Sequence, residues 1–310
     1  MCAGSYTGIG KTALLRGVRF LQSNVFPQPA VLSRRLRGRI SLWQRVAELY
    51  RFRDLLYYLV VRELKARYKG SLLGFLWTLV NPLLMMLVFT AVFTIITPNA
   101  TVPQYPVFLL CGLLPWNFFS AGVMTSIGSV VGNANLVKKV YFPREVLPIA
   151  SVLAQLVNFL LALVVLFALL FVFQADISPY VFLLPLVIAI QTIFIVGLAL
   201  LLSAVNVYYR DTMMIMDVVI LAWFFLTPIF YPLNILPQSY VAFGVTLNIH
   251  RLMYILNPMA SIINAYRDLL YLGTYTEIDF LLRTALTSLG VLLFGYWLFT
   301  RVSGNFGEEV

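Results

Sequence analysis

The feature that most constrains this chain is a series of six long apolar stretches separated by short polar loops. Each stretch holds 18 to 27 residues, and an α-helix needs about 20 to cross a bilayer. Backbone groups inside a bilayer need internal partners, so such stretches fold as helices. The six predicted spans are residues 73–96, 106–131, 147–173, 180–205, 215–232 and 280–299.

The overall composition agrees with a membrane location. Of the 310 residues, 61% are hydrophobic and 11% are charged, whereas a soluble domain has about 45–50% apolar and about 25% charged residues. The mean hydropathy of +0.90 has the same implication. We therefore predict an all-α integral membrane protein with six transmembrane helices.

Lys and Arg set the predicted orientation, because cytoplasmic loops are enriched in them. An even number of spans places both termini on one side. Nineteen of the 22 Lys and Arg residues fall on that side, whereas Arg251, Arg267 and Arg283 fall on the other. Both termini are therefore predicted to be cytoplasmic. The net charge of +10 is concentrated before residue 70, and that position suits an anionic leaflet rather than nucleic acid.

Two segments outside the spans have distinct patterns. Residues 43–72 place Leu56, Leu59 and other apolar side chains on one helical face, which predicts an amphipathic helix at the membrane interface. Residues 251–273 are broken at Asn257-Pro258 and predict an outward-facing segment, either re-entrant or interfacial. The remaining predicted regions are a flexible cytoplasmic tail at 1–42, a transmembrane domain at 73–300 and a second tail at 301–310.

A nucleotide-binding motif is only partly present near the N-terminus. Gly10, Lys11 and Thr12 match the end of a P-loop, but Ser5 stands where its first glycine belongs. A working P-loop also follows a hydrophobic strand and opens a helix, and only four residues precede Ser5. We predict no cofactor in this chain.

The predicted spans give no evidence that an ion gradient drives transport. Spans one to four contain no Asp, Glu, Lys or Arg, whereas an ion-driven transporter needs such groups within the membrane. An enzyme would place its acids in the outer loop, where His250, Asp268, Glu277 and Asp279 have no diagnostic spacing. If the protein transports, its energy is expected from another chain.

Four stretches together resemble a known family. They are RYKGSLLGFLWTLVNPLLMMLVFTAVF (67–93), GLLPWNFFSAGVMTSIGSVVGNANLVKKVYFPREVLP (112–148), YYRDTMMIMDVVILAWFFLTPIFYP (208–232) and LNPMASIINAYRDLLYLG (256–273). In this order they resemble the membrane subunit of ABC-2-type polysaccharide exporters, the permeases for O-antigen, capsular polysaccharide and teichoic acid. The resemblance covers about residues 45–300.

The resemblance implies a mechanism and partners. Two copies of the permease form a channel along their interface in the bacterial or archaeal cytoplasmic membrane. Two separate ATPase subunits bind ATP and Mg²⁺ and dock below, and the substrate is a polymer on an undecaprenyl-type lipid. Alternatives are export of teichoic acid, another amphiphile or a drug, and, more distantly, a membrane-bound enzyme of envelope synthesis.

The same resemblance places a coupling helix for the ATPase in the 133–145 loop. Charge and aromatic surface in this loop, with an Arg-Asp pair in the next loop, suit an interface anchor, although a positive-inside loop is the plainer interpretation. The Tyr141-Phe142 pair is expected to be exposed. The predicted coupling residues are Lys138, Lys139, Tyr141, Phe142, Arg144, Glu145, Arg210 and Asp211.

Cations and aromatic residues predict the substrate path. Basic residues before span one either attract the diphosphate of a lipid-linked sugar or anchor the leaflet; they are Arg62, Lys65, Arg67 and Lys69. Aromatic rings suit the C–H faces of sugars, and also occur at membrane interfaces. The predicted lining residues are Trp77, Trp116, Phe118, Phe119, Trp223, Phe224, Phe230 and Tyr231. Polar groups within spans need a partner helix or a wet channel; they are Asn81, Asn117, Gln155, Asn158 and Gln191.

Overall fold

The computed structural model describes residues 50–71, 74–96, 102–173, 178–232, 239–242, 245–276 and 278–310. The predicted tail 1–42 and the first part of the predicted interface helix, 43–49, lie outside the described residues. The chain divides into two compact units, 1–51 and 52–310. All that follows concerns the second unit by itself.

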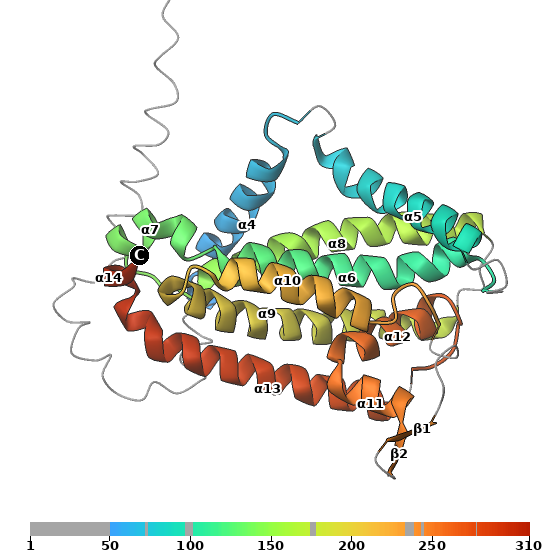
Figure 1. Ribbon diagram of the computed structural model, residues 1–310. Coiled ribbons are helices and arrows are strands. Elements are labelled where there is room, and N and C mark those ends of the chain that lie inside the picture. Colours follow the sequence, from blue (N-terminus) through green and yellow to red (C-terminus); the bar gives the residue numbers. More distant parts are fainter. Residues whose placement is uncertain are drawn as a thin grey trace, which may run out of the picture. The chain divides into compact units, whose positions relative to one another are not determined.

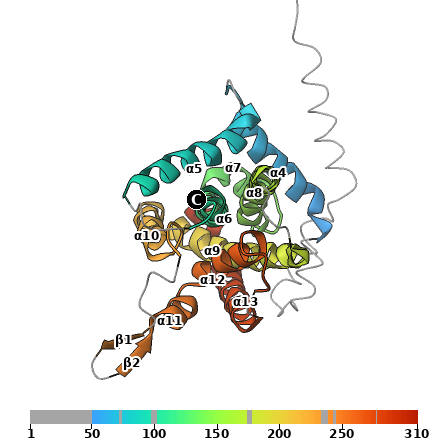
Figure 2. The same cartoon turned by 90° about the vertical axis from the view of Figure 1, so that its right-hand side faces the viewer.

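This unit is a bundle of helices in which α6 is central (Figure 1). Figure 2 looks along the bundle and shows α6 among its neighbours, and α6 contacts α5, α8, α9, α10 and α12. Sixteen residues of α6 are buried, so one sequence stretch supplies much of the core. The long helices are α4 (Arg53–Tyr68), α5 (Trp77–Ile96), α6 (Tyr105–Ile127), α8 (Val146–Val172), α9 (Leu184–Tyr208), α10 (Thr212–Leu226) and α13 (Ile278–Val302).

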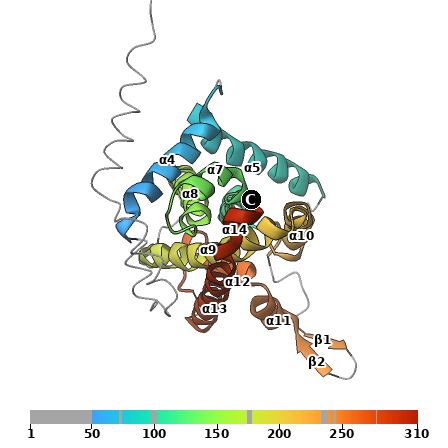
Figure 3. The same ribbon diagram turned by 90° about the vertical axis from the view of Figure 1, so that its left-hand side faces the viewer.

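Short elements gather at the two ends of the bundle. At one end α7 (Ala134–Lys139) lies beside α14 (Phe306–Glu309), as Figure 3 shows. At the other end are α11 (Ile249–Leu256), α12 (Pro258–Leu270) and a hairpin of β1 (Ser239–Ala242) and β2 (Val245–Asn248). The two strands pair antiparallel, with Ser239 opposite Asn248. The prediction of a purely helical protein did not include this hairpin.

Four helical segments among the described residues are long and apolar enough to cross a bilayer. They are Tyr105–Ile127, Val146–Val172, Pro179–Tyr208 and Ile278–Glu309. Two shorter apolar helices accompany them, Trp77–Val92 and Thr212–Leu226. The prediction of a helical integral membrane protein is confirmed at this level.

A close helix crossing joins α9 to α13 through two glycines. A Cβ atom on Gly197 would lie 2.6 Å from the backbone nitrogen of Leu292, and one on Gly295 would overlap the carbonyl oxygen of Gly197. Small residues allow such close approach between membrane helices, where packing replaces the hydrophobic effect as the cause of association. The two helices therefore form one closely packed pair.

The fifth apolar stretch is helical over only part of its predicted length. The predicted span is 215–232, whereas α10 ends at Leu226 and residues 227–232 are not helical. Thr227, Ile229 and Phe230 are nevertheless buried. Non-helical backbone at membrane depth is tolerated only where protein or water satisfies its polar groups, and here other elements do so.

Arg267 of α12 holds this non-helical segment. Its Nη1 donates to the carbonyl oxygen of Pro228 and its Nη2 to that of Ile229, both at 2.6 Å. Its guanidinium also lies 3.8 Å from the ring centroid of Phe108. Arg267 is only 5% exposed, so its guanidinium lies within the protein. The charge is stabilised by two carbonyl dipoles and an aromatic face instead of water.

Asn257 forms the second contact to the end of α10. Its side-chain oxygen caps α12 by accepting from the backbone N–H groups of Met259 and Ala260 and also accepts from Trp223 Nε1 at 2.8 Å. Its amide nitrogen donates to Thr227 Oγ1 at 2.9 Å. The predicted break at Asn257-Pro258 is confirmed, since α11 ends at Leu256 and α12 begins at Pro258.

We expect Gly295→Ala to destabilise the protein, because the new methyl group forces α13 away from α9. Overpacking of this kind costs about 1–3 kcal/mol. Thermal unfolding of the purified protein in detergent measures the effect as a fall in Tm. Gly290→Ala in the same helix is the matched control, because a Cβ there meets nothing within 4 Å. Equal Tm values for the two variants would contradict the close crossing.

We expect Arg267→Met to destabilise the protein by about 2 kcal/mol or more, because two buried carbonyl groups lose their donors. The control is Arg283→Met, since Arg283 of α13 is exposed. Hydrogen exchange of residues 227–232 supplies a local measurement, and faster exchange there than in the control is the expected result. Unchanged exchange would show that Arg267 does not hold the segment.

Candidate functional site: a polar groove between α4, α5, α6 and α8

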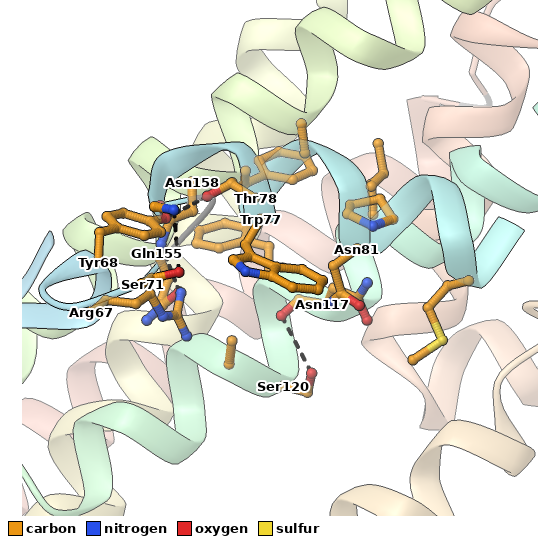
Figure 4. Close-up of a pocket in the computed structure, with 18 residues that line it drawn as sticks. Arg67, Tyr68, Ser71, Trp77, Thr78, Asn81, Asn117, Ser120, Gln155 and Asn158 are labelled. Carbon is orange, nitrogen blue, oxygen red and sulfur yellow. Dashed lines mark hydrogen bonds between the residues drawn. The ribbon is translucent and has the colours of Figure 1, made fainter.

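An open groove of about 620 Å³ lies between four helices. Its walls come from the end of α4, the start of α5, the middle of α6 and the first half of α8 (Figure 4). Ligand pockets in proteins have volumes of about 300–1,000 Å³, so the groove is large enough for a ligand. Arg67 is the one charged residue among its described lining residues.

A hydrogen-bond network closes one end of the groove. Arg67 Nη1 donates to Gln155 Oε1 at 2.8 Å, and Asn158 Nδ2 donates to the same oxygen at 3.1 Å. Tyr68 donates its hydroxyl to Asn158 Oδ1 at 2.8 Å and also contacts the hydroxyl of Thr78. The network connects the end of α4 and the start of α5 to α8. Arg67 itself remains exposed at the groove.

Aromatic and amide side chains line the rest of the groove. Figure 4 places the Trp77 ring between the Tyr68 end and the end that carries Asn81 and Asn117. Trp77 is 46% exposed, so much of its ring surface is free. Amide and hydroxyl groups beside an aromatic face can bind the hydroxyl groups and the C–H face of a sugar, and a guanidinium can bind a phosphate.

The predicted polar residues of the spans divide between two roles. Gln155 and Asn158 join the network, and Asn81 and Asn117 line the groove. Gln191 is fully buried and bridges two helices: its Nε2 donates to the carbonyl of Pro115 at 2.7 Å, and its Oε1 accepts from Tyr266 at 2.8 Å. The expected partner on another helix is confirmed for Gln155, Asn158 and Gln191, whereas Asn81 and Asn117 face the groove.

The predicted entrance cations lie on α4 or directly after its end and do not all face the groove. Arg62, Lys65 and Lys69 line a second, shallower hollow of about 320 Å³, whereas Arg67 lines the groove. Arg62 also donates its Nη2 to Asn133 Oδ1 at 2.7 Å. The interface helix and the start of the 133–145 loop are therefore directly connected.

The predicted coupling residues differ in exposure. Tyr141 is 64% exposed, but Phe142 is 6% exposed, so the expectation of an exposed aromatic pair is wrong for Phe142. Phe142 therefore offers little surface for a partner protein. Glu145 is also buried. The exposed members are Lys138, Lys139, Tyr141, Arg210 and Asp211.

Arg144 in the same loop is half-buried and turned toward the C-terminal residues. Its guanidinium lies 6.0 Å from the ring centroid of Phe306. Burial lowers the pKa of Arg144 from its usual value, and Glu145 and Tyr141 raise it in part. No pattern in the sequence predicts that this cation faces residues 306–307.

Most of the predicted lining aromatics pack against one another inside the chain. Trp116, Phe118, Phe119 and Phe230 are buried. The ring of Trp116 lies 5.2 Å from that of Phe119 and 5.5 Å from that of Phe224, and Phe119 lies 5.0 Å from Trp223. Tyr231, Trp223 and Phe224 are partly buried. Aromatic pairs at these distances stabilise each other, and of the eight only Trp77 is exposed.

Sequence reasoning missed several residues that the tertiary structure brings to these sites. Ser71, Thr78 and Ser120 join the groove, although isolated hydroxyl residues in apolar helices have no distinguishing signal. Phe306 was also missed. It is the one large apolar residue in the polar stretch SGNFGEE, and that contrast was a usable signal of burial.

The sequence matches a known family and several known proteins. The family described as ABC-2 type transporter matches residues 54–271. The O-antigen export system permease protein RfbA of Myxococcus xanthus is 37% identical over 86% of this chain and 98% of its own length. A protein of the same name from Klebsiella pneumoniae is 33% identical over 78% of this chain and 91% of its own length.

A more distant relative is named after a different polysaccharide. The polysialic acid transport protein KpsM of Escherichia coli is 25% identical over 78% of this chain and 90% of its own length. The family match covers more than half of the chain and includes α4, the groove, the 133–145 loop and α12. The chain is therefore a member of the ABC-2 type transporter family.

Proposed function

We propose that this protein is the membrane permease of an ABC transporter that exports a lipid-linked polysaccharide, such as O-antigen, across the cytoplasmic membrane. The observation that carries the proposal is the polar groove, in which one cation, several amides and an exposed Trp share a space open between membrane helices. The names of the relatives, which refer to O-antigen and polysialic acid, agree with this chemistry.

The groove suits the part of the substrate in which the lipid diphosphate is joined to the first sugars of the polymer. Arg67 is a bidentate donor for phosphate oxygens, and the cations of α4 increase the local positive potential. Trp77 offers a ring face to a sugar, while Asn81 and Asn117 offer donors and acceptors. Apolar drugs need few of these groups, which is why a polysaccharide is preferred over a drug as the cargo.

A second copy and an ATPase complete the proposed transporter. The exposed side of α10 carries a continuous apolar stripe of Met214, Val218, Leu221 and Phe225. Asp217 lies on the same exposed side, where a charge facing lipid is costly. We therefore assign this side of α10 to a second copy of the chain, with the polymer channel between the two.

ATP hydrolysis is assigned to two separate ATPase subunits, which bind ATP and Mg²⁺. Their docking surface is the exposed part of the 133–145 loop together with Arg210 and Asp211. This assignment places both termini in the cytoplasm and all six apolar stretches across the membrane. It also places α11 and α12 at the outer side, with α12 as a re-entrant segment near the exit.

We expect Trp77→Ala to lower polymer export about five- to tenfold, because the substrate loses a ring face at the groove. This change corresponds to about 1–1.4 kcal/mol. The measurement is ATP-dependent export of lipid-linked polymer by proteoliposomes that contain the permease and its ATPase. Trp297→Ala is the matched control, since Trp297 of α13 is 50% exposed but is not part of the groove.

Arg67→Gln tests the phosphate part of the proposal. Binding of undecaprenyl-diphosphate sugar to the purified permease is expected to weaken by about tenfold or more, because a charge-assisted hydrogen bond is lost. Binding of an undecaprenyl alcohol without phosphate is expected to be unchanged. An equal loss of binding for both lipids would show that Arg67 does not bind the phosphate. Separately, polymer export by the permease without an ATPase would overturn the transporter assignment.

A further inference from the structure

One aromatic residue near the end of the chain connects three separate elements. Phe306 of α14 is fully buried, although the residues around it are polar. Its ring lies edge-on to Phe299 of α13, with centroids 5.3 Å apart, and 6.3 Å from the ring of Tyr208 at the end of α9. On the remaining side is the guanidinium of Arg144, 6.0 Å from the ring centroid.

Other contacts surround the same position. The hydroxyl of Tyr208 donates to the carbonyl oxygen of Val302 at 3.3 Å, which ties the end of α9 to the end of α13. The backbone of Gly307 lies against Arg144, since a Cβ there would be 3.6 Å from Nη2. Figure 3 shows α14 next to α7 at this end of the bundle, and the two elements are in contact.

The elements that meet at Phe306 differ in how closely they are packed. α9 and α13 form a closely packed pair through Gly197 and Gly295. The loop that carries Arg144 has α7 as a single short helix with one buried residue, Val137, and its two lysines are exposed. A displacement of this loop therefore reaches the α9–α13 pair through Arg144 and Phe306. It also reaches α8 directly, because α8 begins at Val146.

We propose that Phe306 is a positioning residue that fixes the 133–145 loop to the ends of α9 and α13. Through this contact, movement of the ATPase is passed to both helices. This inference rests on the proposed function, because it takes the loop as the site of ATPase docking. Arg144, one of the predicted ATPase-coupling residues, acts from the loop side of the contact by holding the loop against Phe306.

The first experiment uses the permease–ATPase complex in proteoliposomes and measures polymer exported per ATP hydrolysed. Phe306→Ala is expected to lower this ratio about fivefold, with ATPase co-purification and ATP hydrolysis retained. Phe306→Tyr is expected to restore the ratio, since it keeps the ring. Gly304→Ala is the matched control, because a Cβ there meets nothing within 4 Å. An unchanged ratio in Phe306→Ala would overturn the inference.

Arg144→Gln supplies a second variant that leaves the aromatic core of the contact in place. It is expected to lower the ratio as well, and the double variant with Phe306→Ala is expected to be no worse than the more severe single variant, since both remove one contact. If the Phe306→Ala variant does not reach the membrane, the ratio of polymer exported to ATP hydrolysed in Arg144→Gln tests the inference by itself. If the losses of the two single variants add in the double variant, Arg144 and Phe306 act separately, and the proposed contact between them does not transmit the movement.

A distance measurement separates this inference from the proposed function, because it needs neither polymer nor ATP. Spin labels are placed at Lys139→Cys and Arg210→Cys, both exposed positions, in the full chain with Cys2→Ser. Phe306→Ala is expected to broaden the distance distribution between the labels, and Gly304→Ala is not. Equal distributions would overturn the positioning role even if export of polysaccharide is demonstrated.

Discussion

The need to pair polar groups inside an apolar bundle governs this structure. Little water is present within a membrane to satisfy backbone or amide groups, so each one needs a partner from the protein. Gln191 meets this need by bridging α6 and α12, and Arg267 meets it at the non-helical end of α10. These contacts fix the relative positions of helices whose apolar surfaces alone would allow many arrangements.

The groove is a place where polar side chains face open space instead of another part of the chain. Gln155 and Asn158 are satisfied by Arg67 and Tyr68, but Asn81 and Asn117 face an open space. Polar groups that remain available in a membrane protein indicate a path for a polar ligand. The same rule that stabilises the core thus identifies the site at which a sugar–phosphate substrate is proposed to bind.

The apolar stretches and their breaks were predictable because they follow from local composition. Asn257-Pro258 separates two helices because proline cannot donate a backbone hydrogen bond and an Asn before it can cap the next helix. The early end of α10 at Leu226 also had a local signal, which the predicted span 215–232 did not take into account. Thr227 precedes Pro228, and a residue before proline disfavours the helical backbone conformation. What the sequence did not show is that Arg267 and Asn257, distant along the chain, hold the non-helical backbone.

Sequence alone therefore determined a helical membrane protein, its family and the positions of its polar groups, because hydrophobic length and motif order are properties of the chain itself. Tertiary structure decided which of these groups meet. It brought Arg67, Gln155 and Trp77 to one groove, placed Phe142 and most predicted lining aromatics inside the chain, and set Phe306 against Arg144. These outcomes depend on how helices far apart in sequence cross, and residue spacing along the chain does not specify those crossings.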